Sequence, residues 1–172
     1  MHSIWLVPAE PLKSRLRAVI RQLATQYDAV DFAPHVTISA GTSDDDETCA
    51  IARDIASRFS PVELTFQKLD YTSLYTKTLF VQFDHSAIAQ SMCDAIKEGS
   101  AQPSGYVLNP HLSLLYKTMP QATQAEIARG LEVPQGIFSF DRLRAIETEA
   151  PLTQPEQVKR WRVVFEAALG RP

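Results

Sequence analysis

The sequence predicts an α+β protein, one domain over residues 1–172 that is built from two related halves. Short apolar or alternating stretches typical of strands are separated by longer stretches in which apolar residues have helical spacing. No low-complexity linker divides the chain. A five-residue pattern, Pro-His-apolar-hydroxyl-apolar, occurs at residues 34–38 and again at residues 110–114. The two copies are too far apart for a solenoid repeat, so we expect two lobes that face each other across a cleft.

The first part of the chain predicts a strand, a helix, a second strand and a second helix. Residues 4–7 are all apolar, as in a short buried strand, and Pro11 then stands where a first helical turn tolerates proline. Apolar residues recur at helical spacing from there to Tyr27. The first copy of the pattern predicts a strand at residues 35–40, and the acidic residues 44–47 suit the N-terminus of a helix.

The second part of the chain predicts a hairpin followed by alternating helices and strands. Residues 62–69 and 79–83 have strand character and are close enough in the sequence to pair as antiparallel partners. Residues 158–169 favour a strand, although the positions of their apolar residues also allow a helix. The other expected elements are a helix at 86–98, a strand at 111–116, a helix at 120–131 and a strand at 137–146.

The composition argues against a long nucleic-acid partner and against a membrane partner. The formal net charge is −3 and the calculated pI is about 5.8, so no overall basic field is expected. We find neither a signal-peptide pattern nor an apolar run of transmembrane length, and we expect a cytoplasmic monomer. Cys49 and Cys93 are too few for a disulfide framework or a Cys-based zinc site, so we expect reduced, buried thiols.

The repeated pattern places a histidine and a hydroxyl group on the same face of each predicted strand. Residues two apart in a strand share a face, so His35 lies on the same side as Thr37, and His111 on the same side as Ser113. The apolar residues of each copy then point to the opposite face, towards the core. Each proline suits the first position of a strand, where no ladder hydrogen bond is lost. We therefore expect both histidines at strand starts, facing a common cleft.

Two histidines and two hydroxyl groups are the set that hydrolysis of a phosphodiester requires. One imidazole can take a proton from water, the other can protonate the leaving oxygen, and the hydroxyl groups can hold the phosphoryl oxygens. Neither copy of the pattern contains a second metal ligand at suitable spacing, so we expect no metal and no cofactor. A single histidine at a strand start is more often structural, and it is the repetition that favours catalysis. His2 and His85 lack the pattern and are predicted to lie on the surface.

The sequence around both copies resembles the 2H phosphoesterase superfamily, and within it the plant and yeast cyclic phosphodiesterases. The resemblance lies in Pro34-His35-Val36-Thr37, in Pro110-His111-Leu112-Ser113 with its extension Leu114-Leu115-Tyr116, and in the opening segment Ser3-Ile4-Trp5-Leu6-Val7-Pro8. It implies a bilobal fold in which two antiparallel sheets, backed by outer helices, enclose a central cleft. The order of the expected elements agrees with that fold over nearly the whole chain.

The same resemblance implies an enzyme that opens cyclic phosphates without a metal. The substrates of these cyclic phosphodiesterases are ADP-ribose 1″,2″-cyclic phosphate, a by-product of transfer-RNA splicing that is opened to ADP-ribose 1″-phosphate, and nucleoside 2′,3′-cyclic phosphates, which are opened to 2′-phosphates. The implied partner of this chain is therefore a small cyclic nucleotide.

The resemblance also implies a role for each residue of the site. His35 and His111 are the acid and the base, while Thr37 and Ser113 bind the phosphate. The superfamily favours His111 for activating water and His35 for protonating the leaving oxygen, a direction that the sequence itself does not fix. The resemblance places Tyr116 beside the substrate, although strict strand alternation from His111 points its side chain to the other face unless the strand bulges after Leu114.

Several aromatic residues are candidates for stacking on the nucleotide. Trp5 is the first of them because it belongs to the opening segment that carries the resemblance, and it is the one that we predict to bind substrate. Lys77 is predicted to be an exposed loop lysine, with a charge at the lip of the cleft as the alternative. The other stacking candidates, which the sequence cannot rank, are Phe32, Tyr75, Phe80 and Tyr106.

Two other functions stay open at this stage. The first keeps the chemistry and changes the substrate, as in an enzyme that processes RNA 2′,3′-cyclic ends or a 2′-5′ RNA ligase-like relative. A larger substrate needs a basic channel, and the sequence offers only scattered Arg and Lys residues, with Arg142 and Arg144 as the one notable pair. The second is a nucleotide-phosphate binding module that has lost catalysis.

Overall fold

The computed structural model describes residues 1–41 and 44–170, and within them the chain forms seven strands, five α-helices and one short 3₁₀ helix. Every predicted element is present, and the ambiguous C-terminal segment is a strand. The short helix α5 was not predicted. In chain order the elements are β1 (His2–Pro8), α1 (Leu12–Gln26), β2 (Val36–Gly41), α2 (Asp45–Arg58), β3 (Val62–Asp70), η1 (Tyr75–Lys77), β4 (Leu79–Phe83), α3 (Ala87–Gly99), β5 (His111–Leu115), α4 (Gln121–Gly130), β6 (Ile137–Glu147), α5 (Pro155–Lys159) and β7 (Arg162–Ala168).

All seven strands of the described residues belong to one sheet, which corrects the expectation of two separate sheets. The strand order is β1-β2-β5-β4-β3-β6-β7, every pairing is antiparallel, and an additional pairing of β1 with β6 closes the first six strands into a ring. The cause is the length of β6, which has 11 residues. Its first residues pair with β3, and the rest pair with β1 on one side and β7 on the other. The two halves of the molecule therefore share a strand.

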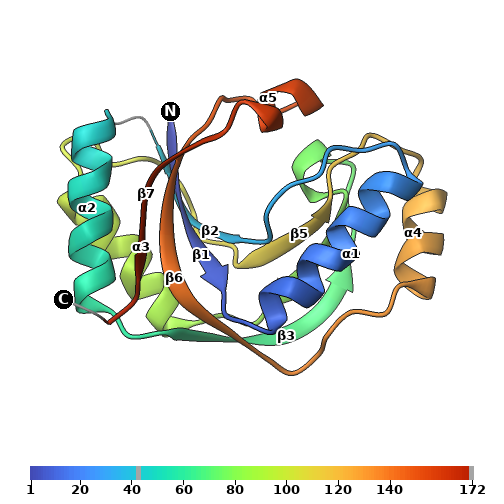
Figure 1. Ribbon diagram of the computed structural model, residues 1–172, viewed down its shortest axis with the longest axis horizontal. Coiled ribbons are helices and arrows are strands. Elements are labelled where there is room, and N and C mark those ends of the chain that lie inside the picture. Colours follow the sequence, from blue (N-terminus) through green and yellow to red (C-terminus); the bar gives the residue numbers. More distant parts are fainter. Residues whose placement is uncertain (42–43, 171–172) are drawn as a thin grey trace.

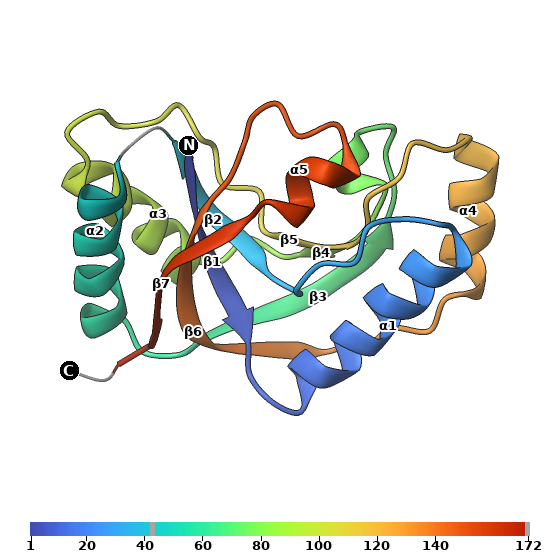
Figure 2. The same cartoon turned by 45° about the horizontal axis from the view of Figure 1, so that its top comes forward.

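The helices form two groups at opposite ends of the sheet (Figure 1). Helices α2 and α3 lie together at one end, and α1 and α4 lie together at the other. The connection from β6 to β7, which contains α5, passes over the space between the two groups (Figure 2). The predicted outer helices are thus present, although the sheet that they cover is continuous.

The core follows the periodicity of the sequence. Helix α1 buries Leu16, Ile20, Leu23 and Ala24, which lie on one face of the helix. The largest fully buried side chains are phenylalanines from β4 and β6, namely Phe80, Phe83, Phe138 and Phe140. Asp44, from the acidic cluster, caps α2 by accepting a hydrogen bond from the Glu47 backbone N–H, as the sequence predicted.

Two predictions about polar residues outside the site can be compared with the structure. His85 is exposed, as predicted. His2 is buried, with 7% of its surface exposed, because it begins a strand that pairs with a neighbour on each side. Its Nε2 lies 2.7 Å from a carboxylate oxygen of Asp45.

Cys93 is buried and Cys49 is partly exposed, and both are free cysteines. Within the described part of the chain, no helix has the length and apolar character needed to cross a membrane.

Candidate active site

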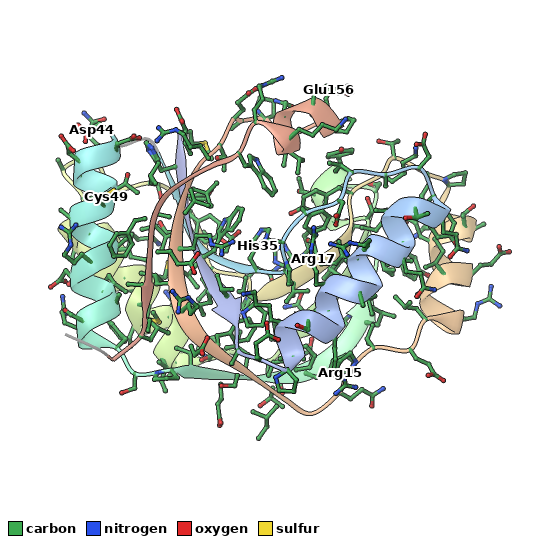
Figure 3. The ribbon with its side chains drawn as sticks, in the orientation of Figure 1. Arg15, Arg17, His35, Asp44, Cys49 and Glu156 are labelled. Carbon is green, nitrogen blue, oxygen red and sulfur yellow. The ribbon has the colours of Figure 1, made fainter. Side chains whose placement is uncertain are left out.

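The closed sheet brings the two copies of the repeated pattern side by side. Strands β2 and β5, which carry the copies, are antiparallel neighbours, and Val36 pairs with Leu112. Residues directly opposite each other share a face of the sheet. This register therefore places His35 beside Ser113 and His111 beside Thr37, on the face opposite to Val36 and Leu112. Figure 3 places His35 near the centre of the molecule, between the two groups of helices.

All six residues that the sequence assigned to the site line one cavity of about 400 Å³. They are His35, Thr37, His111, Ser113, Tyr116 and Trp5. The β6–β7 connection closes the cavity on one side with residues 148–152 and Trp161. The size and the mixture of aromatic and polar walls are those of a small-molecule site.

Strand β5 contains the bulge that the side chain of Tyr116 needs in order to face the cavity. On β4, Phe80 pairs with Ser113 and the preceding residue Leu79 pairs with Leu115, so Leu114 is an extra residue in the ladder. The bulge shifts the alternation by one residue, and the side chain of Tyr116 therefore reaches the cavity.

Strand β2 has the same irregularity at the same place in the pattern. Trp5 pairs with Thr37 and Ile4 pairs with Ser39, so the residue after the threonine is extra, as the residue after Ser113 is in β5. The third residue after each hydroxyl residue faces the cavity in both copies, and these are Ala40 and Tyr116. The repeat thus extends to backbone geometry, with a small side chain in one copy and a large one in the other.

Each histidine is fixed in the same orientation by a backbone carbonyl two residues earlier. Nδ1 of His35 lies 2.7 Å from the oxygen of Ala33, and Nδ1 of His111 lies 2.7 Å from the oxygen of Asn109. A carbonyl oxygen can only accept, so Nδ1 carries the hydrogen in both rings. In the neutral imidazole, Nε2 is then the basic atom, and it is the atom available for proton transfer.

The turns before the two histidines are held by side chains from neighbouring elements. Arg17 of α1 donates to the carbonyl oxygen of Phe32 at 2.5 Å and also binds the carboxylate of Asp31 (Figure 3). Gln82 of β4 donates to the side chain of Asn109 at 2.8 Å and to the backbone oxygen of Pro110 at 2.9 Å. These bonds limit the motion of the segment that leads into each motif strand.

Burial lowers the pKa of both imidazoles. The pKa of His35 falls from 6.5 to about 4, mainly through burial and also through the charges of His111 and Arg144, against the opposing effect of its bond to Ala33. The pKa of His111 also falls to about 4, mainly through burial and also through the charge of Lys77. Both rings are therefore neutral at pH 7 in the protein alone.

The two imidazoles have different neighbours. His35 is 6% exposed, and the Trp5 indole stacks on it with ring centroids 3.6 Å apart and an interplanar angle of 12°. His111 is only partly buried, and it has Phe80 edge-on at 5.6 Å. The ammonium group of Lys77 lies 4.1 Å from the centroid of the Phe80 ring. Lys77 is thus partly buried beside His111, and the prediction of an exposed loop lysine was wrong because η1 packs against β5.

The hydroxyl groups of the two copies have different hydrogen bonds. Ser113 Oγ donates to the backbone oxygen of Thr76 at 2.7 Å. The Thr37 hydroxyl lines the cavity and forms no hydrogen bond with any other described residue. Thr37 can donate directly to a ligand, whereas Ser113 must first turn away from Thr76.

Residues 1–137 of the chain match the family described as cyclic phosphodiesterase-like protein. The chain belongs to the cyclic phosphodiesterase-like family. The match includes both motif strands, and it agrees with the predicted membership of the 2H phosphoesterase superfamily. No curated protein sequence matches the chain significantly.

Several solved structures share the fold of this cyclic phosphodiesterase-like protein. TT0787 of Thermus thermophilus is similar with a TM-score of 0.63 and 12% identity, covering 98% of this chain and 97% of that chain. E. coli LigT complexed with 3′-AMP is similar with a TM-score of 0.57 and 13% identity, covering 99% of this chain and 98% of that chain. At these identities the likeness concerns the fold.

The other aromatic residues that the sequence proposed for stacking on the nucleotide lie in different places in this cyclic phosphodiesterase-like chain. Tyr106 lines the cavity, and its hydroxyl donates to the backbone oxygen of Thr37 at 3.0 Å. Phe32 and Phe80 are buried behind the site, and Tyr75 lines a neighbouring cavity. Sequence reasoning missed Trp161, which lies beyond the residues that match the family and in no recognisable motif. Among the described residues, no group of three or more His, Cys, Asp or Glu side chains could hold a metal ion.

Proposed function

We propose that the protein is a metal-independent cyclic phosphodiesterase. It opens ADP-ribose 1″,2″-cyclic phosphate to ADP-ribose 1″-phosphate, and nucleoside 2′,3′-cyclic phosphates to 2′-phosphates. The observation that carries the proposal is the pair of histidines on adjacent strands, each with Nδ1 bound to a carbonyl and each lining the same cavity. We also propose that the enzyme works as a monomer, because one chain supplies both histidines and both hydroxyl groups of the cavity.

The reaction is a displacement at phosphorus in which one imidazole accepts a proton from water and the other gives a proton to the substrate. His111 takes a proton from water as its oxygen attacks the phosphorus, and His35 gives a proton to the ring oxygen whose bond to phosphorus breaks. The partial exposure of His111 suits the residue that meets water, and the burial of His35 suits the residue that meets the leaving oxygen. The superfamily favours the same direction.

The substrate itself supplies the protonation state that the acid requires. Both imidazoles have a pKa of about 4 in the protein alone, so a proton on His35 at pH 7 needs a negative partner. The phosphodiester anion is that partner, because a nearby negative charge raises the pKa of an imidazole. Since two adjacent imidazolium ions repel each other, one proton is shared by the pair.

The hydroxyl groups hold the phosphoryl oxygens during the displacement. Thr37 donates to one oxygen without breaking a bond inside the protein. Ser113 exchanges its bond with the Thr76 carbonyl for one with the phosphate, and Tyr116, which lines the same cavity, supplies a hydroxyl group for the rotated serine. Trp5 contributes to the wall beside the sugar, although one face of its ring is already covered by His35.

An RNA substrate is the second candidate, and one observation favours it. A second cavity of about 420 Å³ borders Ala33 and Pro34, just before His35. Its basic lining residues are Lys13, Arg17, Arg21 and Arg144. Three of these cations are already paired, Arg17 and Arg21 with Asp31 and Arg144 with Glu166. Because these pairs reduce the charge left for a polynucleotide, the small cyclic nucleotide is the better supported substrate.

The proposal is tested by steady-state kinetics on enzyme treated with a chelator. We expect turnover of a nucleoside 2′,3′-cyclic phosphate to persist in EDTA and to yield the 2′-phosphate. His35→Ala and His111→Ala should each lower kcat by about 100-fold or more, the size expected for loss of general acid–base catalysis.

The matched control is His85→Ala, which removes an exposed histidine outside the cavity and should leave kcat unchanged. Unaltered turnover in both site variants would refute the catalytic pair. Tight binding without turnover would favour the binding module. A higher kcat/KM for cyclic-ended RNA than for ADP-ribose cyclic phosphate or mononucleotides would favour the RNA enzyme.

A further inference from the structure

Trp161 stands at the end of the connection that covers the cavity. This connection leaves β6, includes α5 and returns to β7 across the opening between the helical groups (Figure 2). It lies entirely beyond residue 137, where the match to the family ends. Trp161 therefore lies outside the segment that matches the family and outside both motifs.

The Trp161 ring contacts three of the residues that the sequence assigned to the site. It lies edge-on to Trp5 with centroids 5.1 Å apart, to His35 at 5.9 Å and to Tyr116 at 6.3 Å. The interplanar angles of 70°, 82° and 81° are those of T-shaped aromatic contacts. Since Trp5 also stacks on His35, the two indoles and the imidazole form one packed cluster.

Packing alone does not account for a tryptophan at this position. The indole Nε1 is buried and has no hydrogen-bond partner among the described residues. An unpaired buried donor costs stability, and a phenylalanine or a leucine would fill apolar space without that cost. The size and shape of the indole therefore serve something other than stability.

We propose that Trp161 is a positioning residue that holds Trp5 against His35 and keeps water from that side of the imidazole. The role of Trp161 in catalysis rests on the proposed function. Its position beside His35 rests on the three ring contacts. It acts on one histidine only, because among the described residues Phe80 is the single ring packed against His111. Trp161 thus helps to make the two halves of the repeat unequal.

Replacing Trp161 should leave the charged and polar groups around His35 in place and change only the burial of the imidazole. The charges of His111 and Arg144 and the carbonyl of Ala33 act on the His35 imidazole, and none of them belongs to the β6–β7 connection. They remain when Trp161 is replaced, whereas the burial that lowers the pKa of His35 is partly lost. The pKa of His35 should therefore rise towards its ordinary value.

The test is an NMR titration of the imidazole resonances in Trp161→Ala, Trp161→Phe and a control, Phe165→Ala. Phe165 is a partly buried aromatic residue of β7 that stacks under Arg53 and has no ring contact with the site. We expect the pKa of His35 to rise by about one unit in Trp161→Ala, by less in Trp161→Phe, whose smaller ring still covers part of the imidazole, and to stay near the parent value in the control, with His111 changed little. The kcat of Trp161→Ala should fall about 10-fold, with a smaller change in KM.

An unchanged His35 pKa in Trp161→Ala, or an equal shift in Phe165→Ala, would overturn the inference. If Trp161→Ala does not fold, Trp161→Val is titrated in its place with the same outcomes, because valine also removes the aromatic edge and most of the cover over His35. The titration requires no turnover. An inactive parent enzyme would therefore refute the proposed function and leave this test intact.

Discussion

The two histidines owe their shared geometry to their place at the start of a strand. Each follows a proline, each bonds through Nδ1 to the carbonyl two residues earlier, and each presents Nε2 to the cavity. The sequence predicted the residues and their common face, because strand alternation is a local property. It did not predict the tautomer, because the carbonyl partner depends on the turn before the strand. The rings differ in their aromatic neighbours, which come from distant segments.

The depressed pKa of His35 predicts that the protein loses stability in acid. The pKa is about 4 in the folded protein against 6.5 for an ordinary histidine, so between these values the unfolded chain binds a proton that the folded chain does not. The free energy of unfolding therefore falls as the pH decreases through this range. From pH 7 to pH 5 the contribution of His35 should be about 2 kcal/mol.

Urea unfolding of the parent and of His35→Gln at both pH values measures this contribution. Glutamine does not titrate, so the loss of stability between pH 7 and pH 5 should be smaller in the variant by about that amount. Equal losses in the two proteins would show that His35 titrates normally in the folded state.

At the scale of elements, the bulges in β2 and β5 are the features that shape the cavity. Each places the third residue after the motif hydroxyl towards the ligand, so Tyr116 fills one side and Ala40 leaves room on the other. The sequence could state only that Tyr116 needs a bulge, because a bulge is defined by pairing with a partner strand. The helix α5 was missed for a similar reason, since five residues are too few to display helical periodicity.

The bulge in β2 predicts that a larger side chain at Ala40 blocks the cavity without damaging the core. We expect Ala40→Leu to raise KM for a nucleoside 2′,3′-cyclic phosphate about 10-fold or more while the melting temperature stays near that of the parent. Regular alternation in β2 would instead direct the leucine into the core, where overpacking costs about 1–3 kcal/mol. The matched control is Ala50→Leu on the exposed face of α2. A lower melting temperature with an unchanged KM in Ala40→Leu would contradict the bulge.

At the scale of the whole molecule, the shared strand β6 decides how the halves are joined. The repeat and the resemblance predicted two lobes, whereas the structure has two groups of helices on one continuous sheet (Figure 1). Local patterns could not predict one closed sheet, because nothing in residues 137–147 indicates that their first part pairs with β3 and the rest with β1 and β7. Trp161 could not be predicted for the same reason, because only the path of the β6–β7 connection brings it to the site.

The shared strand predicts that both halves unfold together. Separating them would break the pairings of β6 with β3 or with β1, so neither half keeps a complete set of strand partners alone. We expect one cooperative transition in urea, with the same midpoint by far-UV circular dichroism and by the fluorescence of Trp5 and Trp161. Two separate midpoints would indicate halves that are independent, as in the two-sheet arrangement.

The central claim is that His35 and His111 act together on one phosphate group. The most direct measurement is an NMR titration of both imidazoles with and without adenosine 2′-monophosphate, a product of the proposed reaction. Because the phosphate is negative and lies between the rings, the account predicts that binding raises the pKa of both His35 and His111 above their values near 4. A nucleotide that binds and shifts only one ring, or neither, would contradict it.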